Sequence, residues 1–193
     1  MRPDHTQPFR TTLVSALASG PRNMISLDGF NRAGVLVPIV QTGGDYELLL
    51  TRRTETVETH KGQISFPGGM VDAADTDIVE TALRETMEEI GLGRETVDIV
   101  GLLDDLPTPT GFIITPVVGL IESLPFLSPN VHEVAEVLYV PLSFFADVKN
   151  GRIEMREFRG KQHEVWYYET GKHTIWGATA MIIRSLLKKI GKA

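Results

Sequence analysis

Residues 65–92 read SFPGGMVDAADTDIVETALRETMEEIGL and contain the most informative local pattern of the chain. Its start, SFPGG, predicts a turn, and the acidic loop that follows leads into helical periodicity from Asp77 to Ile90. Gly91 is expected to end the helix, because glycine readily closes a helix C-terminus. At roughly 100° per residue, one side of this helix is largely apolar and the other acidic. The first side comprises Val79, Ala82, Leu83, Thr86, Met87 and Ile90, and the second comprises Glu85, Glu88 and Glu89.

The three glutamates are expected to converge on one point. Glu85 lies three residues before Glu88 and four before Glu89, and both spacings bring helical side chains together. Carboxylate oxygens suit Mg²⁺ or Mn²⁺, which can also bridge to phosphate oxygens. Arg84 lies four residues before Glu88 and can orient a ligand carboxylate. Taken alone, this pattern also fits a solvated acidic helix face. The residues in front of the helix are needed to distinguish a metal site from such a face.

The rest of the chain predicts a mixed α/β domain, with helices before, between and after strands. No repeat or linker interrupts it, so we expect one domain over residues 1–193 with an N-terminal helical extension of about residues 1–30. Strands are predicted at 33–41, 46–53, 97–106, 111–123 and 133–142, a polar loop at 54–65, and a hairpin within 152–168. Helices are predicted at 8–19, near 142–147 and at 173–191.

Composition narrows the function classes. Hydrophobic residues make up 42% of the 193 residues and charged residues 23%, an ordinary globular mixture. The net charge of −6 argues against nucleic acid as a partner. The absence of cysteine excludes disulfides, thiolate nucleophiles and cysteine zinc sites. With no membrane-spanning run and no signal-peptide core, we expect a cytoplasmic protein without membrane attachment.

The turn, loop and helix together resemble the Nudix box, the signature of the Nudix hydrolases. The residues that match are Gly69, Arg84, Glu85, Glu88, Glu89, Gly91 and Leu92. Two departures stand out: the interval from Gly69 to Arg84 is one residue longer than the general pattern, and Asp75 stands where the family has an isolated, loop-supporting glutamate. The resemblance implies the Nudix fold, a mixed β-sheet sandwiched between helices (α/β/α).

A second resemblance, over residues 49–69, is to the coenzyme A pyrophosphatase branch of this family. The matching residues are Leu49, Leu50, Thr51, Arg53, Gly62, Phe66, Pro67, Gly68 and Gly69. It implies hydrolysis of coenzyme A or acyl-coenzyme A to 3′,5′-ADP and the corresponding 4′-phosphopantetheine. Thr54 replaces a usual Ser or Ala, and Glu58 replaces an Arg of the branch signature. Since that change reverses a charge, another nucleotide substrate stays open.

The resemblance also implies roles for individual residues. Mg²⁺ or Mn²⁺ would be held by the Gly69 backbone carbonyl, Glu85, Glu88 and Glu89. Arg84 joins the catalytic group, Arg53 and Lys61 are candidate phosphate binders, and Gly68 shapes the turn at the substrate. Glu133 is the candidate general base and fits the branch better than Glu136 does. The motif HEVAE at 132–136 lacks the second histidine of a zinc site, so zinc is rejected.

Three functions remain in competition. The first is a metal-dependent coenzyme A pyrophosphatase, and the second is a Nudix pyrophosphatase acting on a nucleoside triphosphate, ADP-ribose or a dinucleotide. The third is a non-catalytic nucleotide-binding module, although such modules usually lose box glutamates and all three are present here. In each case the partner is a small nucleotide, and a homodimer is possible.

Overall fold

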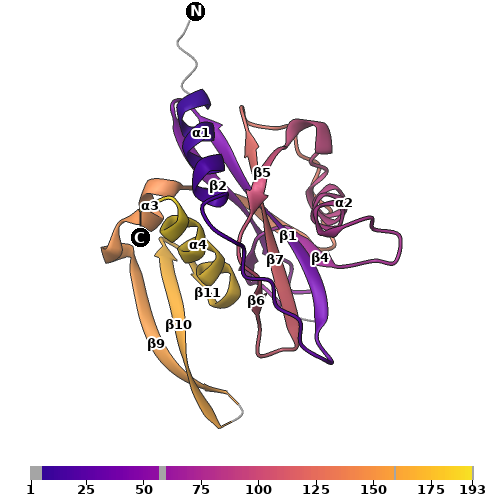
Figure 1. Cartoon of the computed structure of the whole chain (residues 1–193), viewed down its shortest axis with the longest axis vertical. Coiled ribbons are helices and arrows are strands. Elements are labelled where there is room, and N and C mark those ends of the chain that lie inside the picture. Colours follow the sequence, from indigo (N-terminus) through magenta and orange to yellow (C-terminus); the bar gives the residue numbers. More distant parts are fainter. Residues whose placement is uncertain (1–5, 57–59, 159, 193) are drawn as a thin grey trace, which may run out of the picture.

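Figure 1 shows the computed structural model, which describes residues 6–56, 60–158 and 160–192. The first half contains α1 (Thr6–Leu17), β1 (Asn31–Thr42), β2 (Asp45–Arg53), β3 (Ile64–Ser65), β4 (Gly68–Met70), α2 (Ile78–Ile90), η1 (Arg94–Thr96) and β5 (Asp98–Leu102). The second half contains β6 (Leu106–Pro107), β7 (Phe112–Ile121), β8 (Val134–Pro141), α3 (Leu142–Ala146), η2 (Val148–Asn150), β9 (Gly151–Phe158), β10 (Lys161–Thr170), β11 (His173–Trp176) and α4 (Gly177–Lys189).

The central sheet is mixed, as predicted. Within the described residues its strand order is β3-β2-β1-β7-β5, with β4 beside β1, β6 beside β7 and β8 beside β2. The long pairing of β1 with β7 is parallel, whereas the other pairings in this sheet are antiparallel. The middle of β1 is a nearly continuous run of buried apolar residues. A strand inside a sheet that is covered on both faces needs apolar side chains on both sides.

Helices cover both faces of this sheet, which confirms the α/β/α expectation (Figure 1). On one face α2 packs its Ala82 and Leu83 against strand residues such as Leu49. On the other face α1, α3 and α4 pack against strand residues such as Leu50, with Ile183 of α4 fully buried. Adjacent residues of β2 therefore serve opposite faces, since successive side chains of a strand point in opposite directions.

β1 and β2 are paired at one end and apart at the other. The SFPGG turn at 65–69 lies where they are apart. The two strands pair with each other only from Ile39 to Thr42 and from Asp45 to Leu48. Beyond that point β2 pairs with β3, while β1 pairs with β4. The Phe66–Pro67 step between β3 and β4 thus carries the chain from one separated strand to the other, next to α2.

Two predicted elements were wrong in extent. The strand expected at 97–106 is broken into β5 and β6, because Asp105 between them is buried and accepts hydrogen bonds from Thr115 and from the Ile25 amide. The helix expected at 173–191 begins only at Gly177. Its first residues instead form β11, where Ile175 pairs with Tyr168, so the predicted hairpin is a three-stranded sheet in the order β11-β10-β9.

Figure 1 shows β9 and β10 extending away from the central sheet as a long arm. Where this arm meets the body, Tyr168 lies against Phe145 of α3, with ring centroids 5.0 Å apart. None of the described helices is both long enough and apolar enough to cross a membrane.

Candidate active site

Both ends of α2 follow from local sequence signals. Asp77 caps the first turn, because its side chain accepts hydrogen bonds from the amides of Val79 and Glu80 at 2.8 and 2.9 Å. Gly91 adopts the left-handed conformation with φ 68°, and its amide donates to Met87 O. The predicted limits of the helix are therefore confirmed, and they fix where its carboxylates stand.

The predicted division of α2 into two faces was wrong at two positions. Met87, assigned to the apolar side, is 55% exposed, whereas Glu89, assigned to the acidic side, is only 5% exposed. The buried stripe runs instead through Ala82, Thr86 and Glu89, which succeed one another at helical spacings of four and three. One carboxylate of the box is consequently held inside the protein.

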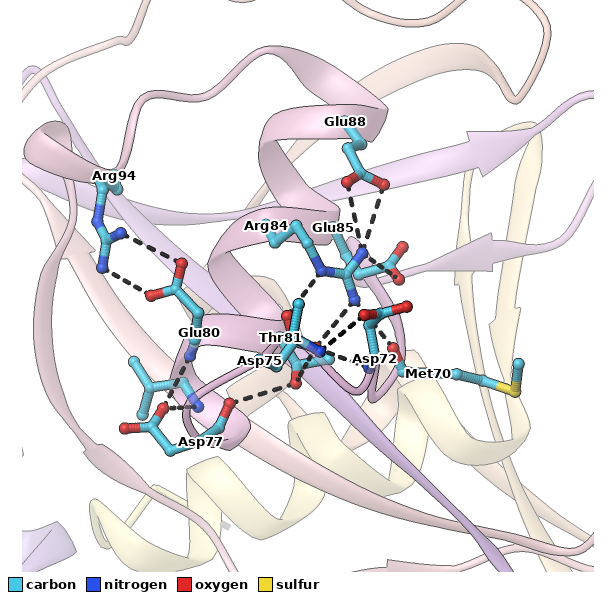
Figure 2. A network of polar contacts seen from close by, with 12 residues as sticks. Met70, Asp72, Asp75, Asp77, Glu80, Thr81, Arg84, Glu85, Glu88 and Arg94 are labelled. Carbon is cyan, nitrogen blue, oxygen red and sulfur yellow. Dashed lines mark hydrogen bonds and ion pairs between the residues drawn. The ribbon is translucent and has the colours of Figure 1, made fainter.

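Arg84 joins the helix to the preceding loop (Figure 2). Its Nε and Nη2 donate to the two carboxylate oxygens of Asp75 at 2.8 and 3.1 Å, and Nη2 also donates to Met70 O at 3.1 Å. Its Nη1 donates to Glu85 at 2.9 Å and to both oxygens of Glu88 at 3.4 Å. Arg84 thus orients two box carboxylates while it fastens the loop, as a fork of five donors allows.

Asp75 supports the loop from a nearly buried position. Besides Arg84, it accepts hydrogen bonds from Thr81 Oγ1 at 2.8 Å and from the Asp72 amide at 2.9 Å. The hydrogen bond from Arg84 and the backbone bond from Asp72 hold the pKa of Asp75 well below its ordinary value. Asp75 therefore links loop to helix from the position where the family has a glutamate.

The two glycines of β4 have different surroundings. Gly68 has φ +149°, and a Cβ there would lie 2.5 Å from Val35 Cα in the neighbouring strand. Gly69 has no positive φ. A Cβ there would lie 2.5 Å from the carboxylate carbon of Glu85, so a larger residue would displace that side chain. The Gly69 backbone and the Glu85 carboxylate therefore stand side by side.

Glu89 and Arg53 form a buried, incompletely satisfied pair. Arg53 Nη1 lies 3.5 Å from Glu89 Oε1, while Glu89 Oε2 and Arg53 Nε are buried without a hydrogen-bond partner. Burial raises the pKa of Glu89 to about 7 against the attraction of Arg53, and Glu133 and Glu85 add repulsion. Buried polar atoms are normally paired, so one oxygen here lacks a cation or donor and one nitrogen lacks an acceptor.

Glu133 is brought to these carboxylates by the segment in front of β8. The amides of Ser128 and Asn130 each donate at 2.8 Å to the carbonyls of Ile90 and Glu89 at the end of α2. Asn130 Nδ2 in turn donates to Glu133 Oε1 at 3.0 Å. Asn130 was not among the predicted site residues, although Pro-Asn is a turn signal in the sequence. In the structure its side chain accepts a hydrogen bond from the His132 amide.

The donor set fits a divalent metal. Burial raises the pKa of Glu85 as well as that of Glu89, and Glu133 repels both. Hard carboxylate oxygens, one of them orphaned and buried, are the chemistry that Mg²⁺ or Mn²⁺ would neutralise. The expected convergence of the box glutamates is incomplete: in the part of the chain that is described, no three acidic or histidine side chains already surround one point. Glu88 is 60% exposed and turns toward Arg84.

Two other residues lie elsewhere. Glu136, which the sequence ranked below Glu133, pairs with Arg52 on the opposite face of the sheet. Lys61 lines a cavity with Arg52 on that same face instead of joining the carboxylates. Glu58 lies outside the described residues.

Comparison with known proteins identifies the family. The NUDIX domain model matches residues 30–168. The chain is 39% identical over 163 residues to a protein of Photorhabdus laumondii named uncharacterized Nudix hydrolase NudL, covering 84% of this chain and 87% of that protein. It is 38% identical over 180 residues to the NudL protein of Citrobacter koseri, covering 88% and 89%.

Solved structures agree in fold. A NUDIX hydrolase from Alicyclobacillus acidocaldarius superposes with a TM-score of 0.56 at 18% identity, covering 84% of this chain and 93% of that one. A MutT/nudix family protein from Enterococcus faecalis gives 0.53 at 15% identity, covering 88% and 71%. The match over most of the chain and the relatives above 30% identity place this protein in the Nudix hydrolase family.

Proposed function

We propose that the chain is a metal-dependent pyrophosphatase that cleaves a nucleoside-diphosphate-linked substrate, with coenzyme A or acyl-coenzyme A as the substrate class. The observation that carries this proposal is the pair of orphaned buried atoms on neighbouring residues, Glu89 Oε2 and Arg53 Nε. One needs a cation and the other an anion. A phosphate brought in with a divalent cation supplies both at once.

Gly69 O, Glu85, Glu88 and Glu89 would hold the metal. When bound, a divalent cation there would neutralise phosphate charge and activate the attacking water. Arg84 keeps Glu85 and Glu88 pointing to the same side of α2, so their positions do not have to be found anew when substrate arrives. Arg53 would donate its free Nε to a phosphate oxygen of the substrate.

Glu133 would accept the proton of the attacking water. Its carboxylate is held by Asn130 and lies near enough to Glu85 and Glu89 to raise the pKa of each. A general base must stand within hydrogen-bond reach of the water, either directly or through a second water. Water adds to one phosphorus, the bridging P–O bond breaks, and the other phosphate leaves with the bridging oxygen.

The upstream signature over residues 49–69 favours coenzyme A, since Arg53, the donor to phosphate, is part of it. The specific observation in favour of another nucleotide is Glu58, a carboxylate where the coenzyme A branch has an arginine. If that arginine serves phosphate binding, its reversal disfavours a ligand with an additional phosphate.

Product analysis by mass spectrometry tests the proposal. The full chain is incubated with coenzyme A, ATP, ADP-ribose and NADH, each with Mn²⁺, Mg²⁺ or EDTA. Metal-dependent release of 3′,5′-ADP and 4′-phosphopantetheine is the expected result. Cleavage of another compound alone would replace the substrate class and keep the chemistry. Tight nucleotide binding with no turnover of any compound would favour a binding module.

A further inference from the structure

A cavity of about 660 Å³ lies on the face of the sheet opposite to Glu89. The faces are distinguished by β2: Leu49 packs with α2, whereas Leu50 packs with α4, so Arg53 and Arg52 point to opposite sides. The cavity lies where four parts of the chain meet: β2, β8, β11 and the segment that precedes β3. Its charged and aromatic walls are Arg52, Lys61, Glu136, Lys172, His173 and Trp176.

Donors in this cavity already converge on an oxyanion, the carboxylate of Glu136. Arg52 Nε donates to Glu136 Oε2 at 3.3 Å, and Lys172 Nζ donates to Oε1 at 3.1 Å. His173 Nε2 lies 3.3 Å from Oε2 but makes no hydrogen bond. Hydrogen bonds from Lys172 and Arg52 lower the pKa of Glu136. Two donors, one from β2 and one from the turn before β11, therefore hold one internal anion.

Positive charge exceeds negative charge here. Among the described residues that line the cavity, Arg52, Lys61 and Lys172 are cationic and Glu136 is the one acid, while the carboxylate of Glu55 lies beside the lining residue Gly62. Within the described ranges Lys61 makes no ion pair. The side chain of Lys172 is 74% exposed, so it can turn toward a ligand in the cavity. Beside these cations stands the indole of Trp176, stacked on Tyr167 with ring centroids 6.0 Å apart. A flat ring next to surplus cations suits a base that carries phosphate.

We propose that this cavity is a second, metal-independent site that binds a phosphate group borne on a nucleotide. Lys61, Lys172 and Arg52 supply the positive charge, and Glu136 serves as the internal counter-ion that holds the cations in place when no ligand is bound. The phosphate belongs either to the far end of the catalysed substrate or to a separate nucleotide. The site shares no residue with the carboxylate face, so it stands whatever reaction that face performs.

Calorimetric titration of the full chain in EDTA tests the site, with adenosine 3′,5′-bisphosphate, AMP and inorganic phosphate as probes. We expect the nucleotides to bind, and Lys61→Gln and Lys172→Gln each to weaken that binding about tenfold, the worth of one charge-assisted hydrogen bond. Lys188→Gln removes the same charge from an exposed position on α4 outside the cavity, and it should change affinity by less than about twofold.

The direction of the change in nucleotide affinity caused by Glu136→Gln distinguishes a counter-ion role from a structural role. Because it removes the competing carboxylate, nucleotide binding should become tighter, whereas a merely structural Glu136 would make binding weaker. A thermal melt of each variant checks that the protein is folded, and the two exposed lysines keep the test informative if the Glu136 variant is not. No binding to the wild-type chain, equal losses with Lys61→Gln and Lys188→Gln, or weaker binding to folded Glu136→Gln would each overturn the proposal.

Kinetics separates the two sources of the phosphate. For the substrate that the carboxylate face cleaves, forms with and without a distal phosphate are compared. If Lys61→Gln raises KM only for the form with that phosphate, the cavity holds the substrate's own far end. If Lys61→Gln weakens nucleotide binding in EDTA about tenfold and leaves both KM values unchanged, the ligand is a separate nucleotide.

Discussion

Two neighbouring arginines of β2 each face a glutamate, and the two pairs differ in almost every property. Arg53 meets Glu89 on the α2 face, where the carboxylate is buried and one of its oxygens has no partner. Arg52 meets Glu136 on the opposite face, where Lys172 and His173 contact the same carboxylate. Burial raises the pKa of Glu89 to about 7, whereas hydrogen bonds from Lys172 and Arg52 lower that of Glu136.

The comparison shows that the pKa of an acid in an Arg–Glu pair depends on its burial and on its other partners, and not on the arginine alone. One arginine does not offset the desolvation of buried Glu89, so that face lacks positive charge. Two cationic donors, Arg52 and Lys172, hold partly exposed Glu136, so positive charge exceeds negative charge at this carboxylate. The alternation of side chains along β2 thus places the proposed metal site and the proposed phosphate site on opposite faces of the sheet.

The largest expected effect comes from removing the buried acid. Glu89→Gln should lower kcat of the metal-dependent hydrolysis by about 10³-fold or more, because a lost metal ligand forfeits several kcal/mol of transition-state stabilisation. Glu157→Gln, which removes an exposed carboxylate from β9, is the matched control and should keep kcat within about twofold. Equal kcat values for the two variants would show that Glu89 has no part in the reaction.

Glu89 should also govern stability in the absence of metal. Its folded-state pKa lies above its unfolded value of about 4.5, so the folded protein binds the proton more tightly, and stability falls as pH rises from about 4.5 to 7. The loss should approach about 3 kcal/mol at full ionisation. Urea unfolding in EDTA at several pH values measures it.

In that experiment Glu89→Gln isolates the contribution, since the difference between wild type and variant cancels the other titrating groups. Saturating Mg²⁺ should remove the slope from the wild type. A pH profile that Glu89→Gln leaves unaltered would mean that the buried carboxylate is already satisfied.

Arg84→Lys tests whether orientation of the carboxylates matters on the α2 face. Lysine keeps the charge but cannot reach Asp75, Glu85 and Glu88 together, so kcat should fall about 10- to 100-fold, the usual cost of disturbing groups that orient metal ligands. Arg94→Lys, in the exposed pair with Glu80, is the control and should leave kcat unchanged. If both variants change kcat by a similar small factor, the contacts of Arg84 matter no more to the reaction than a surface ion pair does.

The smallest effect is expected from Glu136→Gln, and it concerns the free energy of unfolding. Glu136→Gln should cost less than about 1 kcal/mol of unfolding free energy at pH 7, because the pair is partly solvated. The folded-state pKa of Glu136 is lowered, so its contribution is present above the unfolded value and is lost as pH falls through the folded one. Urea unfolding at pH 7 and below pH 4 measures it, and a larger cost at pH 7 would show that both faces depend equally on their acids.

Much of the carboxylate face could be predicted from the chain alone because its signals are local. Asp77 and Gly91 set the ends of α2 through bonds to residues within four positions. The spacing of Arg84 to Glu88 produces the contact that the helix geometry predicts. The resemblance supplied the fold, which the sheet topology confirms.

Which side chains are buried, and on which face of the sheet they lie, depends on long-range packing that the local sequence pattern does not contain. Glu89 is inside and Met87 outside because the sheet beneath α2 sets the buried stripe, and helical periodicity alone leaves its edges undefined. Residues 173–176 form a strand because β10 offers a partner for Ile175, a pairing that local propensity does not contain. Lys61 faces the cavity, away from the carboxylates, because long-range strand pairing assigns its loop to one side of the sheet.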